Sequence, residues 1–357
     1  MQKGKTRMPV YALLIKYREI GLICILALLV LVVGLRNPSF AAPSNLLFIL
    51  EDTSIMAILA FGMMCILLVG SIDISIAAIM AFSAMTVGII MRGMLSEVEV
   101  KTMIDGVEQI ETIRQSLPVG LLVAIGIGVG AVIGLINGVV IAYGNVLPIV
   151  TTLGMQYIVY GACHVISGSQ AVYKKDMSEA FVQFTRVEPL GIDLKIWIMA
   201  AVFLLLYLFI TYMRTGRNLY AVGSNREAAE MRGIPVNRRI VLAHVIMGAL
   251  AGLAGLMYAS HDTKITQDMA MGYEMYVIAA CVIGGVSVTG GSGKITGVLL
   301  GALTIGVINN GLTMMRLTGN SEFWKKAIQG ALILGAVVSN VVLQRIMDKQ
   351  NLRRRNI

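Results

Sequence analysis

The stretch GGVSVTGGSGKITG, residues 284–297, places Lys294 directly after a glycine, as a phosphate-binding loop does. Such a loop has the spacing G-x-x-x-x-G-K-[ST], because its backbone amides cradle phosphates and its hydroxyl ligates magnesium. Counting back from Gly293, the first glycine position holds Val288, and Ile295 stands where the hydroxyl should follow. The stretch therefore predicts no nucleotide site. We expect a tight cytoplasmic turn in which glycines let two helices approach closely.

Uncharged polar residues inside long apolar stretches are a second place where chemistry could occur. Amides and hydroxyls can donate to and accept from a hydroxylated neutral solute without trapping an ion, although each can instead make a hydrogen bond between helices. Charged residues are nearly absent there, where each would cost about 2.5–3.5 kcal/mol. Their absence argues against a proton-coupled pump. The candidate pathway residues are Asn137, Thr151, Thr152, Gln156, Asn309 and Asn310.

Asp73, in GSIDISIAA, lies at the cytoplasmic start of the predicted span 73–92. We expect it to cap the N-terminus of a helix, where it meets the positive end of the helix dipole, and not to contact a solute. The three histidines and four cysteines lack the spacing of a metal site or a disulfide framework. No nucleophile motif or cofactor loop is present, so we expect no catalytic residues and no bound metal.

Composition assigns these residues to a membrane protein. The 357 residues are 57% hydrophobic and 14% charged, with a mean hydropathy of +0.80, whereas soluble domains are about 25% charged. No hydrophilic insert exceeds about 30 residues, too few to fold alone. We expect a single transmembrane domain over residues 1–357 and no attached catalytic domain. The net charge of +9 lies in loops and tails, as the positive-inside rule expects, and does not indicate nucleic acid.

A bilayer core about 30 Å thick needs roughly 20 apolar residues for each helix. On that basis the chain is all-α, with about ten transmembrane helices, and the basic N-terminus leads into an uncleaved first span. The predicted spans are 19–36, 50–70, 73–92, 118–143, 147–168, 195–213, 239–259, 273–290, 295–315 and 323–345.

Charge predicts the orientation of these spans. Basic residues gather in the N-terminal segment 1–18, the loop 214–238 and the tail 346–357, which an even span count puts on one side. That side is the cytoplasm, so both termini are expected there, in a multi-pass protein of the bacterial inner membrane. The opposite loops, 93–117 and 260–272, are acidic. One outer turn is an exception, because Arg316, Lys325 and Lys326 flank it.

Residues 134–162 and 306–336 share a G-[LV]-I-N start and a small-residue end, five predicted spans apart. An odd separation makes the two copies run in opposite directions. The sequence therefore predicts two inverted five-helix halves, an arrangement in which transporters place the substrate path at the interface of the repeats.

The longest cytoplasmic loop, residues 213–239, contains SNREAAEMRG. Ser224 or Asn225 gives a helix start, good helix formers follow, and Gly233 and Pro235 give a stop. We predict a short exposed helix of about two turns that docks a partner. The predicted docking residues are Ser224, Asn225, Arg226, Glu227, Ala228, Ala229, Glu230 and Gly233.

This loop, together with VGSIDISIAAIMAF and GAVIGLINGVVIAYGNVLPIVTTLG, resembles the permease subunits of bacterial ABC importers for monosaccharides, of the ribose, xylose, arabinose and autoinducer-2 type. The resemblance runs from about residue 37 to about residue 336. Residues 216–234 look like the sugar branch, and the branched-chain amino-acid permeases are more distant. Ser71 and Ala77 replace glycines that are usual in the family, which weakens any inference about the substrate.

The resemblance implies a fold like that of type II importers, in which a second permease subunit, identical or homologous, completes the pathway. It also implies that ATP and magnesium bind to partner ATPase subunits and not to this chain, that residues 224–233 are the coupling helix, and that an extracytoplasmic protein delivers the sugar. The function implied is import of a monosaccharide or related polyhydroxylated solute. The alternatives are an ion-coupled secondary transporter with inverted repeats, or a permease for another small neutral solute or a branched-chain amino acid.

Overall fold

The computed structural model of the protein describes residues 18–104 and 107–315, together with residues 327, 330, 331, 334, 335 and 338. The predicted span 323–345, the end of the second repeat copy, most of the predicted N-terminal segment and the tail lie mainly or wholly outside these residues. The described chain forms two compact units. Unit 1 contains described residues 18–53, 279–286 and 293 onward, and unit 2 contains residues 54–278 and 287–292.

In unit 1, α2 (Arg18–Arg36) packs with α13 (Ile295–Met314) and the start of α3 (Pro43–Leu68). A short 3-10 turn, η1 (Pro38–Ala41), reverses the chain after α2 and buries Phe40 against Val33, Ile49 and Val307. At the other end of α13, Lys294 forms an ion pair with Glu19 of α2, with 2.8 Å between Nζ and Oε1. An apolar cluster and an ion pair thus connect α2 to α13 at two levels.

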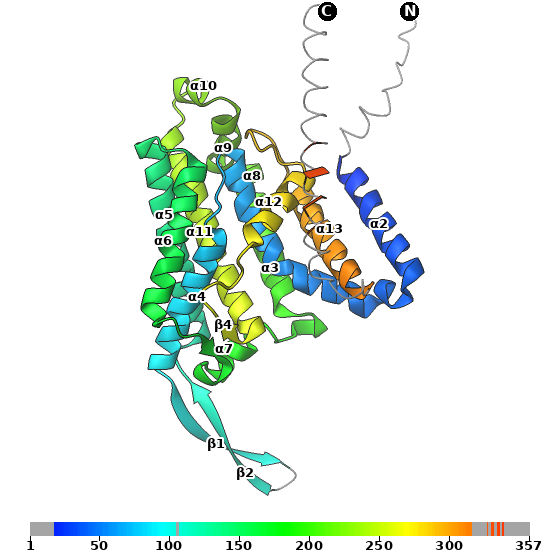
Figure 1. Cartoon of the computed structure of the whole chain (residues 1–357), viewed down its shortest axis with the longest axis vertical. Coiled ribbons are helices and arrows are strands. Elements are labelled where there is room, and N and C mark those ends of the chain that lie inside the picture. The colour runs from blue at the N-terminus through cyan, green and yellow to red at the C-terminus, as the bar shows by residue number, and fades with distance from the viewer. Residues whose placement is uncertain are drawn as a thin grey trace, which may run out of the picture. The chain divides into compact units, whose positions relative to one another are not determined.

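Unit 2 contains the remaining long helices. They are α4 (Ile76–Gly93), α5 (Val119–Gly144), α6 (Pro148–Ser167), α8 (Leu194–Tyr212) and α11 (Val236–Asp262), with the end of α3 and most of α12 (Tyr273–Ile283). Shorter elements join them: β3 (Val172–Tyr173), η2 (Lys174–Asp176), α7 (Glu179–Gln183), η3 (Pro189–Gly191), α9 (Arg214–Ser224), α10 (Arg226–Met231) and β4 (Lys264–Ile265). Figure 1 shows α10 at one end of α5 and α11 and the β1–β2 hairpin beyond the other end of this helical layer.

Helices α5 and α11 pack closely because glycines face each other across the pair. A Cβ on Gly130 would overlap the carbonyl oxygen of Gly248, and one on Gly252 would overlap that of Gly126. Small residues at this spacing let transmembrane backbones touch. The glycine-rich stretches of the two helices therefore form a packing seam.

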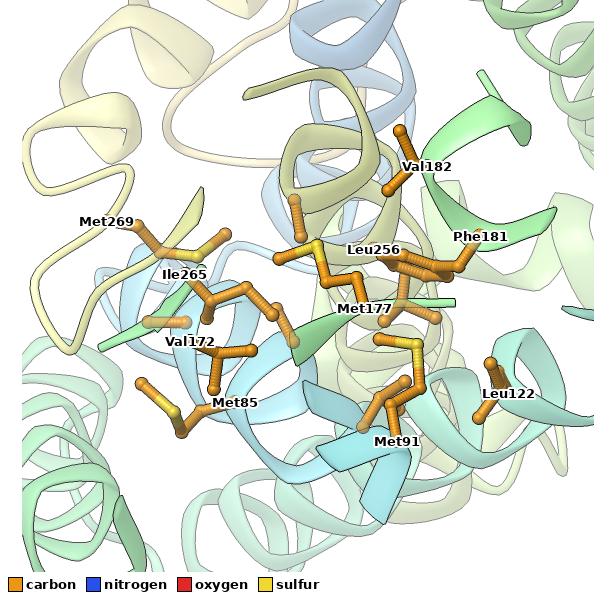
Figure 2. Packing of buried hydrophobic residues seen from close by; sticks show 14 of the residues in the cluster. Met85, Met91, Leu122, Val172, Met177, Phe181, Val182, Leu256, Ile265 and Met269 are labelled. Atoms are coloured by element: carbon orange, nitrogen blue, oxygen red, sulfur yellow. The ribbon is translucent and has the colours of Figure 1, made fainter. Parts of the chain in front are cut away.

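At the end of unit 2 nearest the hairpin, the core is a cluster of methionine, leucine and β-branched side chains. Met85 and Met91 of α4 meet Phe181 of α7, Leu256 of α11 and Ile265 of β4, all fully buried (Figure 2). The short β3–β4 pair, with Val172 opposite Ile265, closes this cluster. These small elements cover the ends of α4 and α11.

Most predicted spans correspond to helices. Eight described helices are long and apolar enough to cross a membrane, namely α2, α3, α4, α5, α6, α8, α11 and α13. Helix α3 begins at Pro43, seven residues before the predicted start. Proline is favoured at the first position of a helix because its φ is already helical, and the polar residues that follow continue the helix. Helix α12 ends at Ile283 instead of residue 290, since Gly284 and Gly285 follow it and Gly285 has φ +94°. The all-α integral membrane class is confirmed.

The loop 93–117 departs from the all-α prediction. Residues Ser96–Ile104 (β1) and Val107–Gln115 (β2) pair as an antiparallel hairpin, with Glu97 opposite Arg114. Arg114 holds the base of the hairpin, since its guanidinium lies 3.6 Å from Glu179 of α7 and donates to the carbonyl of Lys174. The acidic segment predicted as a loop thus has a defined pairing and a fixed base.

Candidate functional site

The predicted docking helix is present as α10 (Arg226–Met231). Asn225 is its N-cap, because its side-chain oxygen accepts the amide of Ala228 at 2.9 Å. Gly233, at φ +76°, ends it, and the amide of Ile234 returns to the carbonyl of Ala229 at 3.1 Å. The start and stop signals in the sequence therefore placed this helix correctly.

The exposed surface of α10 is partly the one predicted. Ser224, Asn225, Arg226, Glu227, Glu230 and Gly233 are exposed and Ala228 is half-buried. Ala229 is only 3% exposed and faces the protein, so it supports the helix and cannot contact a partner. Met231, absent from the predicted set, is 83% exposed. The sequence could have predicted Met231 as a docking residue, because it is an apolar residue at the end of a short amphipathic run.

Helix α9, which the sequence did not predict, connects α10 to the membrane helices. Leu219 and Val222 of α9 are fully buried. Arg217 donates to the carbonyl of Tyr212 at 2.7 Å and to that of Thr211 at 3.2 Å, which satisfies the last carbonyls of α8. Helix α9 is therefore joined to the end of α8 by hydrogen bonds as well as by the chain.

The glycine-rich turn packs against the residues just before α10. A Cβ on Gly290 would lie 2.9 Å from the carbonyl oxygen of Gly223 and 3.0 Å from the amide of Gly70. The amide of Gly291 donates to the carbonyl of Leu68 at 3.0 Å. Gly290 and Gly291 have φ +95° and +74°, which favours glycine. Residues 287–292 thus contact both the end of α3 and the end of α9, just before α10 begins.

A second polar cluster surrounds the break between α3 and α4. Residues 71–74 are neither helix nor strand, and α4 begins at Ile76, three residues later than predicted. Asp73 is fully buried, and its Oδ1 accepts the amide of Ser75 at 2.9 Å and the Ser75 hydroxyl at 2.6 Å. The expected capping role thus needs correction: Asp73 holds the residue before the helix, and the first-turn amides receive no side-chain cap.

Two of the predicted pathway residues meet at this break. Asn137 of α5 donates to Ser75 Oγ at 3.0 Å, and Thr152 of α6 accepts the amide of Ile74 at 3.2 Å. On the opposite side, His244 of α11 lies 3.4 Å from the Ser71 hydroxyl. Three helices therefore converge on residues 71–75 through polar side chains. Within the described chain, Asp73 Oδ2 and Asn137 Oδ1 are buried without a hydrogen-bond partner.

The remaining predicted pathway residues are more dispersed. Gln156, on α6, is 8% exposed, and Thr151 is half-buried. Asn309 and Asn310 belong to unit 1, where the side-chain Nδ2 of Asn45 donates to Asn310 Oδ1 at 3.1 Å. In the described ranges no group of three or more His, Cys, Asp or Glu side chains is placed to hold a metal ion.

Long apolar helices and a glycine-packed helix pair identify the described chain as an integral membrane protein. The chain belongs to the family described as the permease component of the branched-chain amino acid transport system, which matches residues 45–337. The predicted resemblance to permease subunits of importers is confirmed. Family membership identifies a translocation component and not an enzyme.

Similar proteins include several sugar permeases. The ribose import permease RbsC of Escherichia coli K12 is 32% identical over 318 residues, 88% of this chain and 91% of that protein. The D-allose permease AlsC of the same strain is 33% identical, covering 92% of each chain. RbsC of Bacillus subtilis 168 is 33% identical, covering 88% and 89%. No solved structure matches the chain.

Proposed function

We propose that this chain is the transmembrane pathway subunit of an ATP-driven importer for a monosaccharide or a related small polyhydroxylated solute. The observation that carries this function is α10, a short exposed helix that is capped at both ends and attached to the membrane helices by α9. The similarity to ribose and allose permeases over about nine-tenths of the chain supports a sugar as the solute.

In this function α10 docks in a groove of a partner ATPase, which binds ATP and magnesium. The exposed Met231 supplies an apolar contact and Glu227 a charged one. Movement of the ATPase displaces α10, and the displacement passes through α9 to α8 and through the turn 287–292 to α3. A second permease subunit completes the pathway, and an extracytoplasmic binding protein delivers the solute.

The break at residues 71–75 is the part of the described chain best suited to a hydroxylated solute. Asp73 Oδ2 and Asn137 Oδ1 are buried acceptors without partners, and such acceptors are costly to leave unpaired. Sugar hydroxyls can donate to both. We place this cluster beside the solute path, with Thr152 bonded to the backbone amide of Ile74 and His244 beside the Ser71 hydroxyl.

The docking role is tested by binding of the partner ATPase to purified full-length variants. Glu227→Arg and Met231→Asp are expected to weaken the association by about tenfold or more, since interface hot spots are worth at least about 2 kcal/mol. Met271→Asp is the matched control, because Met271 is also exposed but lies in a different loop. Ala229 is left unchanged in this test, since it is buried and cannot contact the ATPase. Undiminished ATPase binding by both variants would overturn the docking assignment.

The rival function is an ion-coupled secondary transporter. Proteoliposomes that contain this chain alone, with an imposed ion gradient, should then accumulate solute. Proteoliposomes that also contain the ATPase and the binding protein should instead accumulate a sugar only when ATP is supplied. Accumulation by the chain alone would establish the rival function.

A further inference from the structure

The α5–α11 seam opens into a groove at the end nearest α10. The groove has a volume of about 390 Å³ and is lined by Val139 and Tyr143 of α5 and Arg238, Val241, Leu242 and Val245 of α11. Beside the groove the two helix backbones are in close contact, because a Cβ on Gly138 would lie 2.7 Å from the Cα of Val241. Four of the six lining residues are aliphatic. From Arg238 to Val245 the groove follows α11 for seven residues, about 10 Å along the helix axis.

A second depression, of about 400 Å³, adjoins this groove and shares Tyr143 and Arg238 with it. It is lined otherwise by Glu230 and by residues 233–237, the turn that connects α10 to α11. One positive and one negative side chain therefore line the same depression. Among the described residues, no ion pair or hydrogen bond occupies the Arg238 guanidinium.

The neighbouring surface of α5 is apolar and exposed. Val132, Leu135, Ile136 and Val139 are each more than 40% exposed, on a helix long enough to cross the membrane. The groove thus begins among side chains that suit acyl chains and ends at a charged depression. Basic pockets between transmembrane helices near the cytoplasmic surface bind lipid headgroups.

We propose that the two depressions together form a binding site for one phospholipid with an ammonium-bearing headgroup, of the phosphatidylethanolamine class. The part of an acyl chain nearest the headgroup lies along Val139, Val241 and Val245. The phosphate meets the Arg238 guanidinium and the Tyr143 hydroxyl. The ammonium meets Glu230, a residue that would repel a purely anionic headgroup.

The bound lipid contacts the turn 233–235, which ends α10. Occupancy of the site therefore stabilises one position of the α10 segment relative to α11. Lipid binding at this site does not depend on the identity of the transported solute or on docking of an ATPase.

The site is tested by native mass spectrometry of the full-length chain in detergent with equal amounts of phosphatidylethanolamine, phosphatidylglycerol and phosphatidylcholine. We expect phosphatidylethanolamine to be retained preferentially. Arg238→Ala should reduce its retention by about tenfold, since a hydrogen bond between charged groups is lost. Val241→Trp, which fills the groove, should reduce retention of all three lipids. Arg232→Ala is the matched control, because Arg232 is exposed but lines neither depression.

A change of headgroup preference gives the sharpest readout. Glu230→Lys should shift retention from phosphatidylethanolamine to phosphatidylglycerol, because both lining charges are then positive. This substitution lies on the surface and keeps the result interpretable if Val241→Trp fails to fold. Equal retention of the three lipids by the unmodified chain, or no shift in Glu230→Lys, overturns the proposal. Loss of chain–chain association in Val241→Trp with lipid retention unchanged would assign the groove to a second copy of the chain instead.

Discussion

Lys294 shows how one side chain acquires its role from its neighbours. It follows a glycine, as the lysine of a phosphate-binding loop does, yet its ammonium pairs with Glu19 of α2 and its side chain is 68% exposed. The glycines around it serve backbone geometry, since Gly290 and Gly291 have positive φ and contact Gly223 and Ser224. The stretch belongs to helix packing and not to nucleotide chemistry.

We predict that Lys294→Ala leaves nucleotide binding by the assembled transporter unchanged. An exposed ion pair is worth at most about 1 kcal/mol, so thermal stability should fall only slightly. Fluorescent nucleotide titration and a melting curve measure the two quantities. Glu19→Ala is the control and should have the same small effect on stability. A large loss of nucleotide affinity in Lys294→Ala alone would contradict this assignment.

Gly290 should tolerate no side chain. Gly290→Val places carbon atoms against the backbone of Gly223 and Gly70 at a positive φ, so the turn must move away from the α10 segment. We expect the stimulation of ATPase activity by solute to be lost while the chain still enters the membrane. Gly154→Ala is the control, because nothing lies within 4 Å of its Cβ position. Normal stimulation in Gly290→Val would show that the turn does not connect α10 to α3.

At the scale of elements, helix caps could be predicted from the sequence and long-range contacts could not. Asn225, Gly233 and Pro235 fixed α10 because caps are local. Helix α9 was missed because the same loop reads as basic and polar. The β1–β2 hairpin was missed although EVEVK in β1 alternates polar and apolar residues with a period of two. In β2 the apolar residues Val107, Ile110 and Ile113 are three apart, and the acidic charge of the segment favoured a loop. The break that gathers Asp73, Asn137 and Thr152 depends on tertiary packing.

The α5–α11 seam gives a prediction with a matched control in the same helix. Gly130→Ala would drive its Cβ into the carbonyl of Gly248, whereas the Cβ of Gly128→Ala meets nothing within 4 Å. We expect Gly130→Ala to destabilise the protein by about 1–3 kcal/mol through overpacking. Gly128→Ala should leave the stability unchanged or slightly higher. Thermal unfolding in detergent compares them, and equal melting temperatures would exclude the seam as a stabilising contact.

At the scale of the whole molecule, the chain has the composition and helices of a multi-pass membrane protein, and its charge distribution predicts an orientation. The basic loop 214–238 contains α10, and the acidic segment 93–117 contains the hairpin. Within unit 2 these two elements lie at opposite ends of the long helices (Figure 1). The prediction of both termini in the cytoplasm and of inverted halves involves residues beyond those described and stays a prediction.

We predict that single cysteines at the two ends of unit 2 react from opposite sides of the membrane. In a background without Cys24, Cys65, Cys163 and Cys281, Ser96→Cys should react with a membrane-impermeant maleimide in intact cells lacking the outer membrane. Arg226→Cys should react only in inverted vesicles, since the positive-inside rule predicts that the basic loop is cytoplasmic. Both positions are exposed. Labelling of both cysteines from the same side would refute the topology.

The two hydrogen bonds from Arg217 to the last carbonyls of α8 have a mechanical consequence. A connection of one residue, Met213, between two helices would ordinarily act as a flexible joint. The Arg217 guanidinium spans that joint, and Gly216 lets α9 press against the backbone of Phe209. We therefore predict that the joint between α8 and α9 is stiff, and that a push on α10 would tilt α8 instead of being absorbed by bending of the loop.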